Sequence, residues 1–307
     1  MSGGCVSLET SEKRFDMKII IIICLIVLII IPYTRLIIFN PLKTIYYAIV
    51  DTIKYFRYKL YNKAKSGSMV AYCGHFGKGK TLSMVYDVVK NYKRYNNKKY
   101  FDGKEWKTNK VIILSNVVLT IPYIHLINAK QITSYFEELK KIDDKFHYIV
   151  YVCIDEASVV FNSRNFKDNI NPLLLNSILT CRHYNASIFY TSQKFKLVDA
   201  LLRSVTQDVC MCGKIWRLAR YKVYEADSVE NCVDVGLLKP KKTRGYFCSS
   251  RVYGQYDTLA TVDNLQKSYT VKDLLSSADI LTSLQGDGNI LVNINQNKKG
   301  FLRRMSH

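Results

Sequence analysis

Eight consecutive residues have the types and the spacing needed to hold a phosphate chain. They are Gly74, His75, Phe76, Gly77, Lys78, Gly79, Lys80 and Thr81. The glycines let backbone N–H groups turn inward around an anion, and a helix that opens at the end of the loop, where Leu82 follows, adds its positive end. In such a loop Lys80 reaches the β and γ phosphates, and the Thr81 hydroxyl binds Mg²⁺. The stretch predicts binding of ATP with Mg²⁺, and the alternative is a glycine turn without a chemical role.

A second chemical group consists of two carboxylates, Asp155 and Glu156, which follow the apolar run at 147–154. This pattern is typical of a central parallel strand that brings acids to the edge of the sheet where ligands bind. We expect Asp155 to hold Mg²⁺ through water, and Glu156 to orient and deprotonate the attacking water. A strand end with two solvated acids is the alternative, but the phosphate loop earlier in the chain favours the catalytic interpretation.

The surrounding pattern predicts the elements that position these groups. A strand at 68–73 precedes the loop and a helix from Leu82 follows it, and further strands are expected at 111–118, 147–154 and 186–193. The last of these ends in Gln193, which we expect to contact the γ-phosphate. One additional strand between the loop unit and the Asp-Glu unit is typical of RecA-like P-loop ATPases. The predicted fold is therefore α/β, with a central, mostly parallel sheet.

Other segments give weaker signals. Residues 132–142 and 173–184 have helical periodicity. The lysine- and asparagine-rich stretch at 91–110 predicts a solvated loop.

The stretch from Arg182-His183 through the strand that ends in Gln193, continued by Asp199 and Arg203, resembles a known family. It is similar to the zonular occludens toxin (Zot)-like ATPases of filamentous phage assembly and, more distantly, to the FtsK and HerA motors. The resemblance covers about residues 68–213. It implies a homo-oligomer, expected to be a hexameric ring, in which Arg203 or Arg182 of one subunit reaches the γ-phosphate of the next. It also implies phage DNA and coat or other assembly proteins as partners.

A long apolar stretch precedes the predicted ATPase domain. Residues 19–31 are uniformly apolar, and continuation to Phe39 gives a length of about 30 Å as a helix, enough to span a bilayer. The predicted organisation is a disordered segment at 1–18 and a transmembrane helix at 19–39. A cleaved signal peptide is disfavoured because no small-residue cleavage site follows, and a buried core element is the other alternative. Zot-like proteins usually carry their span after the ATPase domain, so this order favours a membrane-tethered motor.

Basic residues follow the predicted span, whereas the charges before it cancel. The positive-inside rule therefore predicts a single-pass protein of the host inner membrane with the ATPase domain in the cytosol. Residues 40–66 mix lysines with tyrosines and apolar residues. We expect a juxtamembrane helix that lies along anionic headgroups, and an ordinary helix packed on the ATPase domain is the alternative.

The net charge of +20 favours a polyanionic partner, either nucleic acid or an anionic membrane. After an ATPase domain at 67–213, alternating residues predict a small β-rich extension at 214–260, with strands around 216–224 and 245–253 joined by a basic turn. Its interleaved cations and tyrosines suit a nucleic-acid strand, although a plain β extension with a solvated face explains them equally well. Residues 261–307 are predicted to be a partly disordered tail.

The sequence thus predicts a membrane-anchored ATPase that couples ATP hydrolysis to DNA movement in phage assembly or extrusion. Two alternatives use the same site. One is a DNA-packaging or conjugative translocase, and the other is a nucleotide-gated membrane scaffold for virion assembly.

Overall fold

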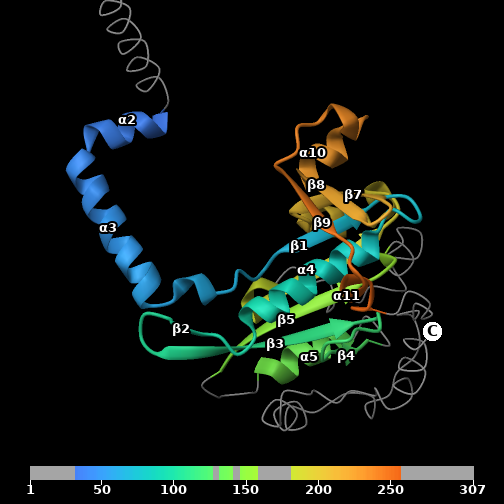
Figure 1. Ribbon diagram of the computed structural model, residues 1–307, viewed down its shortest axis with the longest axis horizontal. Helices are drawn as coiled ribbons and strands as arrows, with labels where there is room; N and C mark the ends of the chain where they lie inside the picture. Colours follow the sequence, from blue (N-terminus) through green and yellow to red (C-terminus); the bar gives the residue numbers. More distant parts are fainter. Residues whose placement is uncertain (1–31, 127–130, 141–145, 158–180, 257–307) are drawn as a thin grey trace, which may run out of the picture. The chain divides into compact units, whose positions relative to one another are not determined.

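The computed structural model describes residues 32–126, 131–140, 146–157 and 181–256 (Figure 1). The chain divides into two units, residues 1–61 and 62–307. The first unit holds α2 (Pro32–Phe39) and α3 (Pro41–Arg57), and the short 3-10 helix η1 (Leu60–Asn62) lies at the boundary. Among the residues that the structure describes, no helix is long and apolar enough to cross a membrane. The predicted segments 1–18 and 261–307 lie outside the described residues, and so does most of the predicted span at 19–39.

The second unit is built on a sheet that has nine strands within the described residues. In chain order these are β1 (Met69–Cys73), β2 (Lys99–Phe101), β3 (Trp106–Ser115), β4 (Ile124–His125), β5 (Phe146–Ile154), β6 (Ala186–Ser192), β7 (Asp208–Ile215), β8 (Leu218–Glu225) and β9 (Lys242–Phe247). Their spatial order is β2-β3-β5-β6-β1-β7-β8-β9, and β4 pairs with β3. The pairs among β3, β4, β5, β6, β1 and β7 are parallel, whereas β2, β8 and β9 are antiparallel. The predicted α/β fold with a mostly parallel sheet is confirmed.

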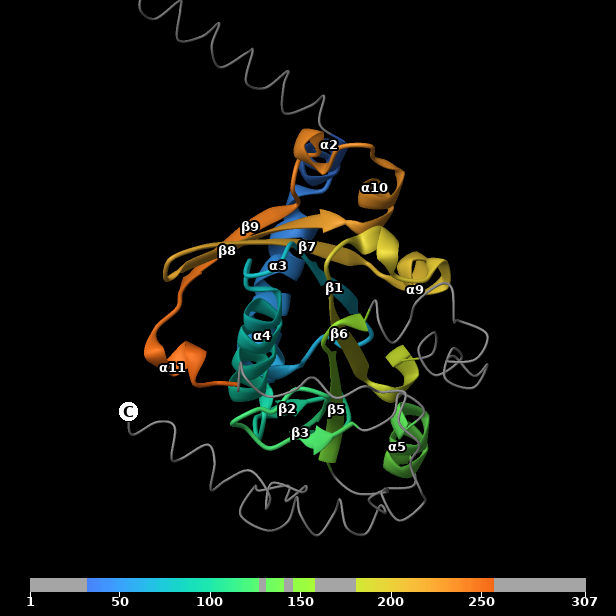
Figure 2. The ribbon, with the colours of Figure 1, turned by 90° about the vertical axis from the view of Figure 1, so that its right-hand side faces the viewer.

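Helices cover both faces of this sheet (Figure 2). On one face lies α4 (Lys80–Tyr95), whose Met84, Val85 and Val88 are buried against the sheet. The other face carries α5 (Gln131–Lys140) and α9 (Ala200–Val205), which form a separate apolar cluster with the opposite side chains of the strands. Strand β6 is buried along its whole length, as expected for a central strand with both faces covered.

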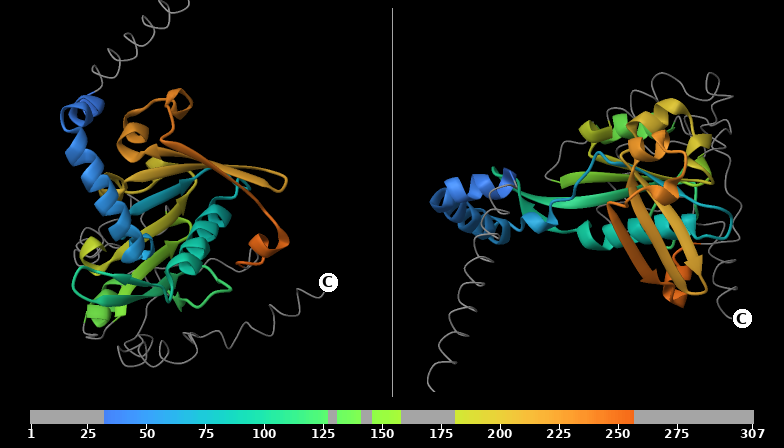
Figure 3. Two further views of the ribbon diagram at one scale, coloured as in Figure 1. Left: turned by 60° about the vertical axis from the view of Figure 1, so that its left-hand side comes forward. Right: turned by 90° about the horizontal axis from the view of Figure 1, so that it is seen from above.

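The remaining elements are short. They are η2 (Cys181–Tyr184), η3 (Phe195–Leu197), α10 (Ala226–Asn231), η4 (Val235–Leu237) and α11 (Ser250–Tyr253). The strand predicted at 245–253 therefore ends early, because β9 stops at Phe247 and the chain turns into α11. Helix α11 lies beside α4 (Figure 3). Between β8 and β9 the chain forms α10 and η4 in place of a simple basic turn. Residues 173–180 of the helix predicted at 173–184 lie outside the described residues, and its last residues form η2.

The predicted solvated loop at 91–110 is wrong. Helix α4 continues to Tyr95, and β2 pairs with β3 as an antiparallel hairpin at the edge of the sheet. Lys98 and Lys99 are exposed, whereas the next residue, Tyr100, is buried. Lys63 and Lys107 both lie within ion-pair distance of the Asp102 carboxylate at the turn. An edge strand tolerates this many lysines because one side of it faces water.

Contacts with α4 hold β8 and β9 in place. The Asp87 carboxylate accepts hydrogen bonds from the hydroxyls of Tyr72 (2.7 Å) and Tyr221 (2.5 Å), which come from β1 and β8. Burial and the neighbouring Asp87 charge raise the pKa of both tyrosines, so they remain donors. On β9 the ring of Tyr246 stacks on Tyr86 of α4 with 4.0 Å between centroids. Strand β7 runs through residue 213, so the sheet is continuous across the predicted boundary between ATPase domain and extension.

Candidate nucleotide site

The phosphate-loop residues form a turn between the carboxyl end of β1 and the first residue of α4. Gly79 precedes the helix with φ of 78°, a left-handed conformation that favours glycine. Gly74 has φ of 156°, and a Cβ at this position would lie 3.1 Å from the carbonyl oxygen of Cys212 on β7. Both positions therefore require glycine, one for its backbone angle and the other also for its close approach to β7.

Two thiols lie in the strands directly beneath the loop. Burial raises the pKa of Cys73 far above its usual range, and burial raises the pKa of Cys212 to about 12. Both side chains therefore stay neutral at physiological pH. They add no negative charge at a place where an anion would bind.

The predicted magnesium ligands lie next to each other. The Thr81 hydroxyl donates a hydrogen bond of 2.8 Å to Asp155 Oδ1, which joins the start of α4 to the end of β5. Asp155 is 6% exposed. Its position is fixed by Asn116, whose amide oxygen accepts from the Asp155 N–H (2.8 Å) and whose amide nitrogen donates to the Asp155 carbonyl (3.3 Å). A carboxylate and a hydroxyl at one buried point are hard oxygen donors of the kind that Mg²⁺ takes beside phosphates.

A threonine without a predicted role completes this group. The Thr191 hydroxyl on β6 donates to Asp155 Oδ1 (2.5 Å) and accepts from the Glu156 N–H (2.8 Å). It therefore connects both carboxylate residues to the strand that lies between β1 and β5. The sequence signal was a polar residue two positions before Gln193, near the end of the strand. Its role became visible only when β6 was placed beside β5.

Glu156 and Lys80 form an ion pair in the loop. Lys80 Nζ lies 3.6 Å from Glu156 Oε1, and the lysine is 6% exposed. Glu156 has φ of 51°, a conformation that costs a non-glycine residue about 1–3 kcal/mol and is enriched at functional sites. The ring of Phe76, otherwise exposed, lies with its centroid 5.3 Å from Lys80 Nζ. The two charges neutralise each other here, and a phosphate chain would compete with Glu156 for Lys80.

A cavity of about 870 Å³ opens beside the loop. Gly74, His75 and Lys78 line one side of it, and Gln193, directly after β6, lines another. The predicted contact of Gln193 with a γ-phosphate stays a prediction. Leu82 differs from the other predicted binding residues because its side chain is buried with Ala219 and Cys248. Only its backbone is left to contact a ligand.

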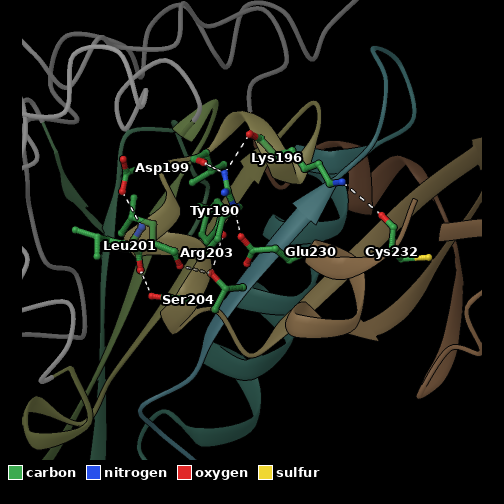
Figure 4. Close-up of polar contacts among 11 residues, drawn as sticks. Tyr190, Lys196, Asp199, Leu201, Arg203, Ser204, Glu230 and Cys232 are labelled. Atoms are coloured by element: carbon green, nitrogen blue, oxygen red, sulfur yellow. Dashed lines mark hydrogen bonds and ion pairs between the residues drawn. The ribbon is translucent and has the colours of Figure 1, made fainter. Parts of the chain in front are cut away.

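The two candidate trans-acting arginines differ in what the structure describes. The side chain of Arg182 lies outside the described residues. Arg203 Nε donates to Glu230 Oε1 (3.0 Å), and its Nη1 donates to the carbonyls of Val198 (2.6 Å) and Lys196 (3.1 Å) (Figure 4). Asp199 caps α9 by accepting from the Leu201 N–H (2.8 Å). Arg203 thus joins α9 to α10 within its own chain, and a role across a subunit interface stays a prediction.

Replacement of Arg203 separates these two roles. If the guanidinium mainly joins α9 to α10, Arg203→Ala should lower the free energy of unfolding by about 1–3 kcal/mol, because three hydrogen bonds are lost and Glu230 is left unpaired. Denaturant unfolding measures this change. Arg251→Ala, at an exposed arginine of α11, is the control and should unfold like the parent. Unchanged stability with a large loss of ATP turnover would contradict the structural role and favour action in trans.

No protein-family model matches the chain, and no curated protein matches it in sequence. Solved structures with a similar fold include the N-terminal domain of zonular occludens toxin from Neisseria meningitidis (21% identity, TM-score 0.42, covering 62% of this chain and 100% of that chain). They also include the genome packaging NTPase of Sulfolobus turreted icosahedral virus 2 in complex with ATP-γ-S (12% identity, TM-score 0.35, 53% of this chain and 94% of that chain). A third is EssC, ATPases 2 and 3, from Geobacillus thermodenitrificans (14% identity, TM-score 0.34, 47% of this chain and 32% of that chain).

Proposed function

We propose that this chain is a RecA-like P-loop ATPase, anchored to the cytosolic side of the host inner membrane, that couples hydrolysis of Mg²⁺-ATP to DNA movement in phage assembly or extrusion. The observation that carries the proposal is the set of contacts at the ends of β1, β5 and β6. There Thr81, Asp155 and Thr191 share hydrogen bonds beside the Lys80–Glu156 pair. The position of β6 between β1 and β5 supports the RecA-like branch.

This arrangement assigns a separate task to each group. With Mg²⁺-ATP bound, Thr81 and Asp155 would hold the ion, and Lys80 would leave Glu156 for the phosphates. Glu156 would then be free to accept a proton from the attacking water. The backbone N–H of Glu156 donates to the Thr191 hydroxyl, and the Glu156 carboxylate lies beside Lys80 of the phosphate loop.

Membrane attachment is supported by α3 as well as by the apolar run at 19–31. Its apolar residues recur at helical spacing and form one stripe, which consists of Leu42, Ile45, Ile49, Ile53 and Phe56, all exposed within the first unit. Arg57 lies beside this stripe, whereas Lys43, Asp51 and Lys54 lie on the other side of the helix. A helix of this kind suits the surface of an anionic bilayer, with its axis in the membrane plane.

The DNA partner is supported by the net charge of +20 and by the basic residues of β8 and β9. Phage coat or other assembly proteins and a hexameric ring follow from the sequence resemblance to Zot-like ATPases. A packaging or conjugative translocase shares every observation above and differs in the destination of the DNA. A nucleotide-gated scaffold would use the same site without moving DNA.

The test is ATP turnover by the full chain in detergent and on vesicles that contain anionic lipid. We expect single- or double-stranded DNA to raise the rate several-fold, and this stimulation to fall steeply between about 50 and 200 mM salt because phosphate contacts release counterions. A rate that rises with vesicles and does not respond to DNA at any salt concentration would contradict DNA movement and favour the scaffold. Absence of ATP turnover in all conditions would contradict the whole proposal.

A further inference from the structure

Strands β7, β8 and β9 have one face turned away from α4. On the face toward α4, Tyr221, Val223 and Tyr246 pack against the helix. Residues directly opposite in neighbouring strands share a face, so the register assigns Ile215, Leu218 and Phe247 to the other face as one row. The next rows along the strands place Arg220 between Gly213 and Gly245, and Lys222 between Met211 and Thr243.

The end of this face is an exposed aromatic cluster. Trp216 is 74% exposed and Phe247 is 53% exposed, and their rings meet edge to face with 6.1 Å between centroids. Ile215 and Leu218 beside them are also exposed. We call Ile215, Trp216, Leu218 and Phe247 the aromatic row. Trp216 also has φ of 50° at the hairpin turn, where glycine is the favoured residue.

The two chain segments that carry the aromatic row have charges of one sign. Residues 213–224 contain four cations and no acid, and residues 239–251 contain five cations and no acid. Some of these cations are already paired, since Lys241 contacts Asp208 and Arg244 contacts Asp87. Within the described residues Arg220 and Lys222 make no ion pair with a carboxylate. Both are exposed on the same face as the aromatic row.

We propose that this face binds single-stranded nucleic acid, with unpaired bases on Trp216 and Phe247 and phosphates on Arg220 and Lys222. This inference rests on the proposed function in DNA movement, and it assigns the binding of the nucleic acid to this face of β7, β8 and β9. Alternate residues of a strand lie about 6.6 Å apart, which suits successive phosphates of an extended polynucleotide. Exposed rings stack on unpaired bases of any sequence, and duplex DNA does not offer these base faces. A second protein would have to bring a strongly acidic surface to the same place.

The location of this face links it to the nucleotide site. Cys212 and Lys214, which precede the hairpin turn on β7, lie against Gly74 and Gly79 of the phosphate loop, with Lys214 Cδ 3.5 Å from where a Gly79 Cβ would stand. The cavity beside the loop also reaches Ile215, Leu218 and Arg220. Single-stranded nucleic acid bound at the β7–β8 hairpin would therefore lie next to the phosphate loop, where we propose that ATP binds.

The fluorescence of Trp216 can report directly on binding at this face. The chain has two tryptophans, and Trp106→Phe leaves Trp216 as the sole reporter in the full chain. On titration with an oligo(dT) strand we expect most of the Trp216 emission to be quenched. Trp216→Ala and Phe247→Ala should each weaken binding about tenfold in fluorescence anisotropy, the effect of losing one stacked base. Arg220→Gln and Lys222→Gln should each reduce the salt dependence of binding.

A matched control exists elsewhere in the sheet. Trp106 on β3 is 51% exposed and meets Phe101 edge to face at 5.7 Å, so it is a similar pair on a different strand. Trp106→Ala should leave oligo(dT) affinity unchanged. Trp216→Phe keeps an aromatic ring and should retain most of the affinity, which separates stacking from damage to the hairpin.

Several outcomes would overturn the inference. One is binding of oligo(dT) without quenching of Trp216, and another is equal competition by duplex DNA of the same length. Quenching by ATP alone, without oligo(dT), would assign the aromatic row to the nucleotide. In these cases the proposed ATPase and DNA movement would stand. Absence of any DNA binding, with ATP turnover intact, would instead remove DNA movement from the proposed function together with this inference.

Discussion

A chain with glutamine in place of Glu156 should bind ATP about as tightly as the parent and hydrolyse it at least about 100-fold more slowly, since general-base groups contribute about 10²–10⁴-fold. Glutamine keeps the shape of the side chain and cannot accept the proton of the attacking water. ATP affinity should not fall, because in the nucleotide-free protein Glu156 competes with the phosphates for Lys80 at 3.6 Å. Removal of that competitor favours the bound state.

The same substitution should change the stability of the protein in a nucleotide-dependent way. Lys80 is buried, and without Glu156 it has lost its neighbouring carboxylate, so the Tm of the nucleotide-free Glu156→Gln variant should fall. ATP should then raise the Tm of the variant by more than it raises the Tm of the parent, because the phosphates replace the lost charge. This difference is a readout that does not depend on turnover.

Thermal unfolding with and without Mg²⁺-ATP, together with phosphate release, measures both effects. Glu225→Gln is the control, because Glu225 is an exposed acid at the end of β8, and it should turn over ATP like the parent. Turnover by Glu156→Gln at the parental rate would show that another group activates the water. Loss of ATP binding in the same variant would show that Glu156 is needed to form the loop.

The phosphate loop, Asp155, Glu156 and Gln193 could be predicted from the sequence because each stands at the end of an apolar strand or in the glycine loop. The carboxyl ends of parallel strands lie at the same edge of a sheet. Thr81 and Asp155 could therefore be placed near each other without knowing the order of the strands. Thr191 and Asn116 were not assigned roles, because their contacts with Asp155 depend on which strands are neighbours. Which strands pair with each other over a long separation in the sequence cannot be read from the residues of one strand alone.

Errors of the sequence-based prediction lie where composition and structure diverge. The segment at 91–110 is rich in lysine, which suggested a loop. Tyr100 is nevertheless buried between its more exposed neighbours Lys99 and Phe101, and β2 pairs with β3 at the edge of the sheet. Arg203 fits a family pattern for an arginine that acts in trans, and that role stays a prediction, but the sequence did not indicate that Glu230 and two backbone carbonyls hold its guanidinium. A pattern of residue types does not reveal which local partners a long side chain will find.

The second large effect is expected for Lys80. Lys80→Ala should weaken ATP binding about 30- to 4,000-fold, because loss of one partner of a buried charge pair costs about 2–5 kcal/mol. The ammonium group is held at the base of the loop beside Glu156, where few water molecules can replace it. Alanine would leave Glu156 unpaired, and this charge would then repel the phosphates. ATP turnover should fall below detection at ordinary ATP concentrations.

Lys78 in the same loop provides the matched control. It carries the same charge two residues earlier, but it is exposed at the rim of the cavity, where water screens its interaction with phosphate. Lys78→Ala should therefore change ATP affinity by less than about tenfold, the range of a solvent-exposed ion pair. Fluorescent ATP analogues measure both affinities directly. If Lys80→Ala bound the analogue like the parent, the loop would not be the phosphate site. Equal losses in the two variants would mean that the loop attracts ATP by its net charge, and that the buried position of Lys80 has no special role.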